Sequence, residues 1–235
     1  MDYISFDPQR YAPSPSIARK HGDKDLWSIA PWVGKQKDQR ILEVGCGCGC
    51  LLLALTERGY GNCQGVDLNE SLIKHGRNVL GVNIVLGNWI ECLEKKKNGA
   101  KFDVIIALDV LEHLPLGEID SALKMTHSWL APGGRFIFRV PNALCPFSTA
   151  LLFGDLTHQF LTTPHSLTHL LKQSGFTAQI AVNECRPAHP VKRFFFKAVH
   201  SLIVKPLFGL AYYHFHGVFP SHLTPNIIGC AYKDH

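Results

Sequence analysis

The chain has 235 residues, of which 46% are hydrophobic and 18% charged, a composition that suits one large globular domain with a substantial core. The formal net charge is +5, and the excess lies near one end, because six lysines and arginines but no acidic residue occur between Glu184 and Asp234. The first ten residues are polar, and no uninterrupted apolar run approaches the roughly 20 residues of a membrane span. We therefore expect a cytoplasmic protein with neither a signal peptide nor a transmembrane helix.

The chain contains eight cysteines, and we expect them to be thiols because the cytosol is reducing. Cys46, Cys48 and Cys50 alternate with glycine, and no C-x-x-C pair occurs. Zinc sites usually draw on such pairs, so no zinc site is expected at these cysteines. They are most simply small side chains that line a tight loop.

One stretch organises the chain, residues 40–51, with the sequence RILEVGCGCGCL. Its apolar first half predicts a buried parallel strand, which has no wet face and need not alternate. The glycines that follow allow a tight turn and a close approach of the backbone to a ligand, because glycine has no Cβ. A helix is predicted from Leu51 to Arg58, which places the loop at a helix N-terminus, where free N–H groups attract anions.

The glycine spacing separates the possible nucleotide-binding families. A dinucleotide fingerprint G-x-G-x-x-G starting at Gly45 needs glycine or alanine at position 50, where Cys50 stands. No Gly-Lys-Ser/Thr follows, which excludes a P-loop. The remaining pattern, E-x-G-x-G-x-G beginning at Glu43, resembles motif I of class I S-adenosylmethionine-dependent methyltransferases. An acid is chemically suited to that position, since this cofactor carries an ammonium and a sulfonium group.

Further motifs follow in the order that this superfamily shows. Asp67 ends a predicted second strand, where one carboxylate can accept hydrogen bonds from both ribose hydroxyls. Asn88 follows a third strand and takes the place of the usual aspartate beside the adenine. Trp89 next to it either stacks on the adenine or packs in the core.

A fourth predicted strand, residues 102–108, leads into Asp109-Val110-Leu111-Glu112-His113, and Ala131-Pro132-Gly133-Gly134 precedes a fifth. Both patterns resemble the superfamily, in which the end of the fourth strand lies beside the methionine and the transferred methyl group. His113 either lines that pocket or packs. The cofactor-binding residues that the resemblance implies are Glu43, Gly45, Cys46, Gly47, Gly49, Asp67, Leu68, Asn88, Trp89, Leu108, Asp109, Val110 and His113.

The resemblance implies an α/β fold, the doubly wound, Rossmann-like seven-stranded sheet of class I methyltransferases, with the last strand antiparallel between its neighbours. Residues 1–24 contain several prolines and predict an extended arm or a short helix outside the core, followed by a short helix that stops or kinks near Pro31. The expected parts of the chain are an N-terminal arm and helix capping the cofactor site (1–39), the core (40–182) with a substrate insertion near 143–170, a basic aromatic insertion (183–225) and the final strand (226–235).

Residues 154–167, GDLTHQFLTTPHSL, resemble a block found in bacterial methyltransferases of surface-polysaccharide, sugar and quinone pathways. His158 is the candidate general base, because transfer to a hydroxyl requires a proton to leave as the oxygen attacks the methyl carbon. Asp155 is the candidate that orients its ring, and a purely structural His158 is the alternative. No metal site is expected, since Asp155, His158 and His165 lack a convincing fourth ligand.

The tail combines aromatic residues with cations. Arg193 and Lys197 fall on one face of a predicted helix, whereas Phe195 and Leu202 fall on another. Such a helix suits an anionic bilayer surface or a lid over a lipid-linked acceptor. We expect residues 186–218 to contact the inner face of the membrane peripherally. Packing against the domain or dimerisation is the alternative, and nucleic-acid binding is disfavoured because the aromatic residues dominate.

The sequence predicts an S-adenosylmethionine-dependent methyltransferase, with S-adenosylhomocysteine as product, that methylates a hydroxyl of a small molecule or of a lipid-linked sugar or quinone precursor. Protein or RNA methylation is the alternative among enzymes, although no N-P-P-Y-like motif follows the fourth strand. A non-catalytic cofactor-binding module for a membrane or a partner is a further alternative, and the intact glycines and Asp67 argue against it. The sequence does not indicate the oligomeric state.

Overall fold

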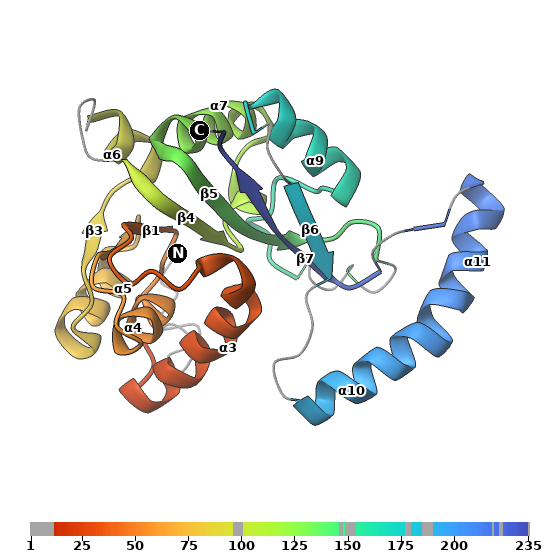
Figure 1. Ribbon diagram of the computed structural model, residues 1–235, viewed down its shortest axis with the longest axis horizontal. Coiled ribbons are helices and arrows are strands. Elements are labelled where there is room, and N and C mark those ends of the chain that lie inside the picture. The colour runs from red at the N-terminus through yellow and green to blue at the C-terminus, as the bar shows by residue number, and fades with distance from the viewer. Residues whose placement is uncertain are drawn as a thin grey trace.

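A computed structural model describes residues 12–95, 101–145, 148, 154–176, 180–184, 190–217, 219–220 and 223–234 of the chain. For residues 93–95, 180–184, 190, 192–193, 196–197 and 216 it describes the backbone alone. A seven-stranded sheet forms the centre of the molecule, and helices cover both of its faces (Figure 1). The expectation of a Rossmann-like α/β fold is confirmed.

The strand order is β3-β2-β1-β4-β5-β7-β6, in which β1 to β5 are parallel and β7 runs antiparallel between β5 and β6. The strands are β1 (Ile41–Val44), β2 (Cys63–Asp67), β3 (Ile84–Leu86), β4 (Phe102–Leu108), β5 (Leu130–Pro141), β6 (Ile180–Glu184) and β7 (Asn226–Tyr232). Val44 pairs with Val66 on one side and with Ala107 on the other, so three strands end level. The order reverses between β1 and β4, and ligands of open α/β sheets bind at such a switch point, beyond the carboxyl ends of the strands.

The helices divide between the two faces. The helical elements are α3 (Pro15–Val33), α4 (Cys50–Glu57), α5 (Glu70–His75), η1 (Gly76–Leu80), α6 (Trp89–Lys95), η2 (Leu111–His113), α7 (Leu116–Trp129), α9 (Pro164–Gln173), α10 (Pro190–Val199), η3 (His200–Val204) and α11 (Lys205–His216). The Asn69 side chain caps α5, because its Oδ1 accepts a hydrogen bond from the Leu72 N–H at 3.2 Å.

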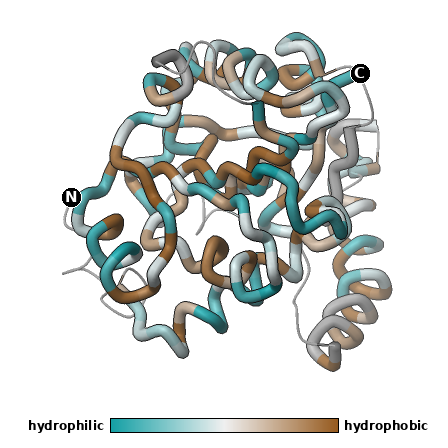
Figure 2. The backbone as a smooth tube through the Cα atoms, turned by 60° about the vertical axis from the view of Figure 1, so that its left-hand side comes forward, coloured by the Kyte–Doolittle hydropathy of each residue, from teal (hydrophilic) through white to brown (hydrophobic). Residues whose placement is uncertain are grey.

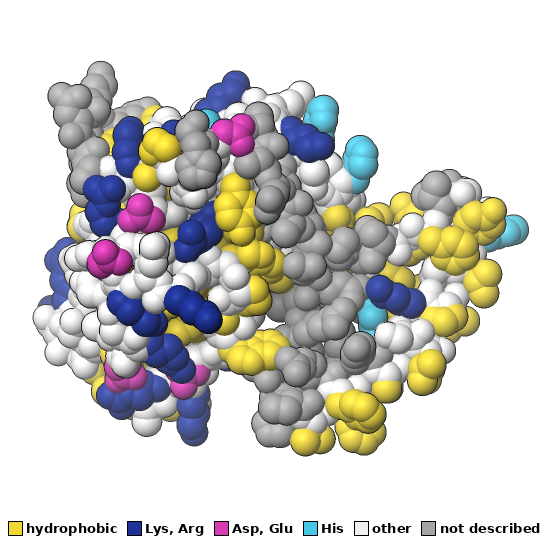
Figure 3. All heavy atoms as spheres, in the orientation of Figure 1, with side chains coloured by type: hydrophobic (Ala, Val, Ile, Leu, Met, Phe, Trp, Pro, Cys, Tyr) yellow, Lys and Arg dark blue, Asp and Glu magenta, His cyan; other side chains and the backbone are white. Residues whose placement is uncertain are grey.

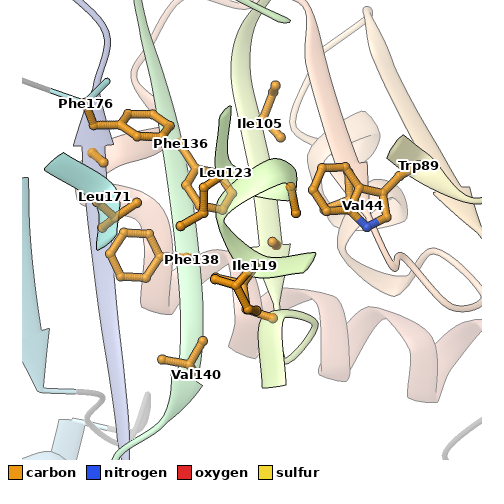
Figure 4. Close-up of a cluster of buried hydrophobic side chains, with 14 of the residues drawn as sticks. Val44, Trp89, Ile105, Ile119, Leu123, Phe136, Phe138, Val140, Leu171 and Phe176 are labelled. Atoms are coloured by element: carbon orange, nitrogen blue, oxygen red, sulfur yellow. The ribbon is translucent and has the colours of Figure 1, made fainter. Parts of the chain in front are cut away.

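The core lies on both sides of the sheet. Every residue of β1 is buried, as a parallel strand covered on both faces requires, and the central strands form an apolar band in Figure 2. On one face α7 and α9 pack on β4 and β5 through Phe136, Phe138 and Phe176 (Figure 4). On the other face α3 and α4 pack through a second cluster that includes Ile29 and Leu55.

The N-terminal prediction was wrong in one respect, because α3 is a core element. The helix begins at Pro15 and runs through Pro31 to Val33, and its buried residues Ala18, Gly22, Leu26, Ile29 and Val33 recur at helical spacing. Proline is tolerated in the first turn of a helix, where its missing N–H has no partner to lose, so Pro15 starts the helix and does not mark a loop. Pro31 falls in the last turn and leaves the remainder of the helix intact.

The helices α10, η3 and α11 form a continuous helical segment, residues 190–216, which stands away from the sheet (Figure 1). Among the described residues these three elements contact chiefly one another. Many of their apolar side chains are exposed, including Phe194, Leu202 and Leu207. In the part of the chain that the structure describes, no helix is long and apolar enough to cross a membrane.

The contact between α3 and α4 gives a stability prediction. A Cβ on Gly22 would lie 2.0 Å from the Cys50 carbonyl oxygen and 2.9 Å from the Ala54 Cβ, and the backbone of α4 cannot yield. We expect Gly22→Ala to destabilise the protein by about 1–3 kcal/mol in urea unfolding, as overpacked cores do.

Gly117 in α7 is the matched control, because it is also helical and a Cβ there would meet nothing within 4 Å. Gly117→Ala should stabilise the protein by about 0.5–1 kcal/mol through helix propensity. Equal effects of the two substitutions would show that the contact between α3 and α4 is looser than described.

Candidate cofactor and acceptor site

The glycine loop is fastened to the end of the neighbouring strand. The backbone N–H groups of Gly45 and Cys46 donate to the Val66 carbonyl at 2.9 and 3.2 Å. The Gly47 N–H donates to Asp67 Oδ2 at 2.7 Å, so the first βα turn and the end of β2 form one unit. The Asp67 carboxylate also accepts from the Asn69 N–H at 2.8 Å, and it lies half-buried at the carboxyl edge of the sheet.

The three glycines of the loop have positive φ for different reasons. A Cβ on Gly45 would lie 2.5 Å from Val110 Cγ2, and one on Gly49 would lie 2.7 Å from Val82 Cγ2, so these two glycines permit packing. A Cβ on Gly47 would meet only the Leu72 Cδ1 at 3.9 Å. Gly47 therefore presents open backbone, where a ligand can approach.

The three cysteines of the glycine loop lie in different surroundings. The Cys46 Sγ faces β2, because a Cβ on Gly65 would lie 2.5 Å from it. Cys48 and Cys50 place their sulfurs 3.6 Å apart as free thiols. Cys46 was expected in the cofactor set, but its side chain is buried against β2.

Glu43 is a buried acid on β1, two residues before the first glycine of the loop. Its Oε2 has no hydrogen-bond partner among the described residues. Burial raises the pKa of Glu43 well above its usual range, the charges of Asp25, Cys48 and Asp67 raise it further, and Arg139 opposes them. A cationic ligand group would satisfy this unpartnered carboxyl oxygen and favour its charged form.

Beyond the ends of β2 and β3, the side chains offer less polar surface to a ligand than expected. Asn88 immediately precedes α6, and its Oδ1 accepts from the Ile90 N–H at 2.9 Å, so this acceptor is already used locally. Trp89 is 7% exposed and packs in the core beside Val44 (Figure 4), so it takes the core alternative and does not offer its face to a ligand. Leu68, by contrast, is 69% exposed next to Asp67 and presents apolar surface at the crevice.

An ion-pair network that sequence reasoning missed lies at the end of β4. The Arg139 guanidinium on β5 binds both oxygens of Asp109, at 2.8 and 2.6 Å, and Asp25 of α3 at 2.7 Å. Asp109 has φ of +57°, a left-handed conformation that is rare outside glycine. The network thus holds the turn after β4 against α3. The Asp109 carboxylate is committed to Arg139, whereas Leu108 is half-buried in the core and Val110 contacts Gly45.

The predicted insertion folds over the turn that carries His113. The N–H groups of Gln159 and Phe160 donate to the Glu112 carbonyl at 2.7 and 3.0 Å, and Gln159 Nε2 donates to the His113 carbonyl at 3.1 Å. The rings of His113 and His158 meet edge to face with centroids 4.8 Å apart. Sequence reasoning had assigned these two histidines to different sites, and the structure brings them together.

Asp155 is linked to His113. Its Oδ1 accepts from the Thr157 N–H at 2.9 Å and from the Thr157 hydroxyl at 2.6 Å, and Thr157 Oγ1 lies 2.8 Å from His113 Nδ1. The contact of Asp155 with Thr157 lowers the pKa of the Asp155 carboxyl. The carboxylate proposed to orient His158 therefore orients His113 through Thr157.

Glu112 completes this group. It is almost wholly buried, its Oε2 has no hydrogen-bond partner among the described residues, and burial with the charge of Asp109 raises its pKa to about 8. The ligand-type atoms of Glu112, His113 and His158 lie within 4.8 Å of one another, the only such group of three within the described ranges. The sequence placed Glu112 in a motif but gave it no role of its own, and it did not single out Thr157, Arg139 or Asp25, because their roles arise from contacts between distant segments.

The fold and this edge of the sheet define a class I methyltransferase architecture. A family model described as a methyltransferase domain matches residues 18–179. The chain belongs to this family of S-adenosylmethionine-dependent methyltransferases, and the predicted class of cofactor is thereby confirmed.

Curated relatives share part of the chain. A ubiquinone biosynthesis O-methyltransferase of Coxiella burnetii (strain Dugway 5J108-111) is 34% identical over 111 residues, which are 45% of this chain and 45% of the relative. The protein of the same name from Acinetobacter baylyi is 26% identical over 160 residues, or 60% of this chain and 66% of the relative. The chain therefore spans about half the length of the Coxiella relative that it matches.

Solved structures share the fold over almost the whole chain. A SAM-dependent methyltransferase from Archaeoglobus fulgidus superposes with a TM-score of 0.69 at 20% identity, covering 99% of this chain and 100% of the other. Phosphoethanolamine N-methyltransferase 2 of Haemonchus contortus, in complex with S-adenosyl-L-methionine, gives 0.61 at 14% identity, covering 100% of this chain and 60% of the other. At these identities the likeness concerns the fold alone.

The carboxylate at the end of β2 gives a binding prediction. Asp67→Ala should weaken S-adenosylmethionine binding at least tenfold, about 1.4 kcal/mol, because the variant loses both the acceptor and the anchor of Gly47. Calorimetric titration of the cofactor measures this, with NAD as a ligand that should not bind. Asp38→Ala, the same substitution in an exposed loop, is the control. Unchanged affinity in Asp67→Ala would remove Asp67 from the cofactor site.

Proposed function

We propose that this chain is an O-methyltransferase that methylates a hydroxyl of a small quinone-type aromatic acceptor. The observation that carries the proposal is the pairing of His113 with His158 beside the turn that touches the glycine loop. Neutral imidazoles suit the removal of a hydroxyl proton near pH 7, which transfer to oxygen requires. The names of the curated relatives support a quinone-type acceptor.

The cofactor residues follow from the geometry of the carboxyl edge. Asp67 is proposed to hold the ribose hydroxyls, Leu68 to contact the adenine, and the open backbone at Gly47 to line the cofactor. Glu43 fits the cationic methionine end, because its unpartnered buried oxygen is the atom that an ammonium group would satisfy. When bound, S-adenosylmethionine supplies the methyl group, and Leu108 to Val110 are proposed to lie beside it.

The acceptor side is apolar at its rim. Leu156 stands between Asp155 and Thr157 and is 93% exposed, and Leu161 in the same segment is 47% exposed. An exposed leucine beside the hydrogen-bonded side chains of Asp155, Thr157 and His113 provides poorly hydrated surface. Such surface suits an aromatic acceptor better than a sugar. His158 and Asp155 are proposed to serve this side of the site. Residues 1–39, of which 12–39 are described, are proposed to support the cofactor edge through the ion pair of Asp25 with Arg139.

We further propose that residues 186–218 place the enzyme on the cytoplasmic face of an anionic membrane. Apolar side chains of the helical segment 190–216 are exposed in a row, as Figure 3 shows, and Phe194 and Leu202 are 72% and 75% exposed. The complementary charge lies in the same part of the sequence, because residues 186–218 contain five lysines and arginines and no acidic residue. Apolar insertion combined with attraction to anionic lipid is the usual basis of interfacial helix binding. The side chains of Lys192, Arg193 and Lys197 lie outside the described residues.

The acceptor class can be tested with labelled methyl donor. Wild-type protein should transfer one methyl group to the hydroxyl of a dihydroxylated aromatic quinone precursor, detected by mass spectrometry. His158→Ala should lower turnover and leave S-adenosylmethionine affinity unchanged in calorimetry. Labelling of amines, protein or RNA in preference to phenols would contradict the proposal, and unchanged turnover in His158→Ala would return that residue to a structural role.

Vesicle flotation tests the membrane proposal. The protein should float with anionic phospholipid vesicles at low salt. It should float less at high salt, because salt screens the attraction between the cations and the lipid, and it should not bind neutral vesicles. The double substitution Phe194→Ser and Phe195→Ser should reduce flotation, whereas Val79→Ser, at an exposed valine on η1, should not. If the substitutions instead shift sedimentation from dimer to monomer, the segment is an interface between copies.

A further inference from the structure

We propose that His113 is the general base of the reaction, acting through Nε2, and that Thr157 and Asp155 are the positioning residues that fix its tautomer. This inference rests on the proposed function and names the group that performs its proton transfer. It differs from the expectation drawn from the sequence, in which His158 was the base and His113 a member of the cofactor site.

The tautomer of His113 follows from counting donors. The Asp155 carboxylate can only accept hydrogen bonds, so the Thr157 hydroxyl must donate its single proton to Oδ1, at 2.6 Å. The hydroxyl oxygen can then only accept from His113 Nδ1, which lies 2.8 Å away and must carry the proton. The lone pair of neutral His113 is consequently on Nε2, which is the state that a base requires.

The position of His113 is fixed from two directions. The backbone N–H of His113 donates to the Val110 carbonyl at 3.1 Å, and Val110 packs on Gly45. The short helix that carries His113 is therefore held against the glycine loop. From the other side, Gln159 donates to the His113 carbonyl. A base held by a short helix on one side and by the docked insertion on the other keeps its orientation without substrate, as preorganised catalysis requires.

Burial, more than the surrounding charges, favours the neutral form of His113. The titratable groups near it are His158, Asp155 and Asp109, together with the adjacent Glu112. Burial and the charge of His158 lower the pKa of His113, whereas Asp155 and Asp109 raise it to a smaller extent. Burial raises the pKa of Glu112 to about 8, so this carboxyl is uncharged at pH 7 and adds no anion that would retain a proton on the imidazole.

The transfer step balances with these groups. The acceptor oxygen forms a bond to the methyl carbon as the bond from that carbon to the sulfonium sulfur breaks, which leaves S-adenosylhomocysteine, and the hydroxyl proton moves to His113 Nε2. The imidazolium then releases its proton to solvent by way of His158, whose ring lies 4.8 Å away between centroids. No redox partner is needed.

The experiment compares His113→Asn and His113→Ala with His165→Ala, an exposed histidine of α9 that serves as a matched control. The His113 variants should lose about 10²–10⁴-fold in kcat, the usual contribution of a general base, and retain S-adenosylmethionine affinity in calorimetry. His165→Ala should keep wild-type kcat. Added imidazole should restore part of the activity of His113→Ala, which a purely structural defect would not allow.

The pH profile gives a second readout. Wild-type kcat/KM should fall on acidification with a midpoint below the ordinary histidine pKa of about 6.5, because the neutral base is present only above its own lowered pKa. In His113→Ala this acid limb should disappear, and the residual rate should rise at alkaline pH as the phenol ionises by itself. Thr157→Val removes the hydroxyl that fixes the tautomer of His113, and it should lower kcat with little change in the KM for the acceptor.

Several results would overturn the inference. They are wild-type turnover in His113→Asn, an acid limb that persists in His113→Ala and disappears in His158→Ala, and activity lost to a chelator and regained with a divalent metal ion. Each is distinguishable from failure of the proposed function, in which the wild-type protein itself would not methylate a phenol.

Discussion

The hydrogen bond from the Gly47 N–H to the Asp67 carboxylate is the interaction on which the cofactor edge depends. It joins the turn after β1 to the end of β2, so that open backbone and an acid lie together at the carboxyl edge of the sheet. The turn requires φ of +55° at Gly47, a conformation that costs other residues about 1 kcal/mol or more. Gly45 and Gly49 need the same hand of backbone in order to pack, and Gly47 needs it in order to leave space. The loop thus combines two demands that only glycine meets.

Two buried carboxyls near the ends of the adjacent strands β1 and β4 show how this edge of the sheet accommodates charge. Glu43 on β1 and Glu112 just beyond β4 each have an oxygen without a partner among the described residues, and burial raises the pKa of both. A neutral carboxyl is far cheaper to bury than an ion, so the unliganded protein can hold both in its core. The Arg139 guanidinium lies close enough to lower both pKa values but is already bound by Asp109 and Asp25. A cationic ligand near Glu43 would restore its charge, whereas Glu112 assists a neighbouring imidazole by staying neutral.

Much of the sheet could be predicted, because strand, glycine loop and helix leave local signals. Val44 and Gly45 mark the end of β1 by composition alone, and Asn69 is a typical helix cap. Signals that depend on distant contacts could not be found in the same way. Pro15 resembled a loop residue until the burial of Ala18 showed that the helix packs on the core. Asp155 lies near His158 in sequence, yet the bond through Thr157 leads to His113, 44 residues before it in the chain.

The acceptor side and the helical segment 190–216 present the same kind of surface. Leu156 is exposed beside the hydrogen-bonded side chains of Asp155, Thr157 and His113, and a row of apolar side chains is exposed along α10 to α11. Exposed apolar surface on this scale is costly in water, which a partner or a membrane relieves. An aromatic acceptor with an apolar tail partitions into lipid, so an enzyme held at the bilayer surface meets it at high local concentration. In the proposed function, the segment that binds the membrane and the histidines that accept the proton therefore serve successive stages of one transfer, delivery of the acceptor and removal of its proton.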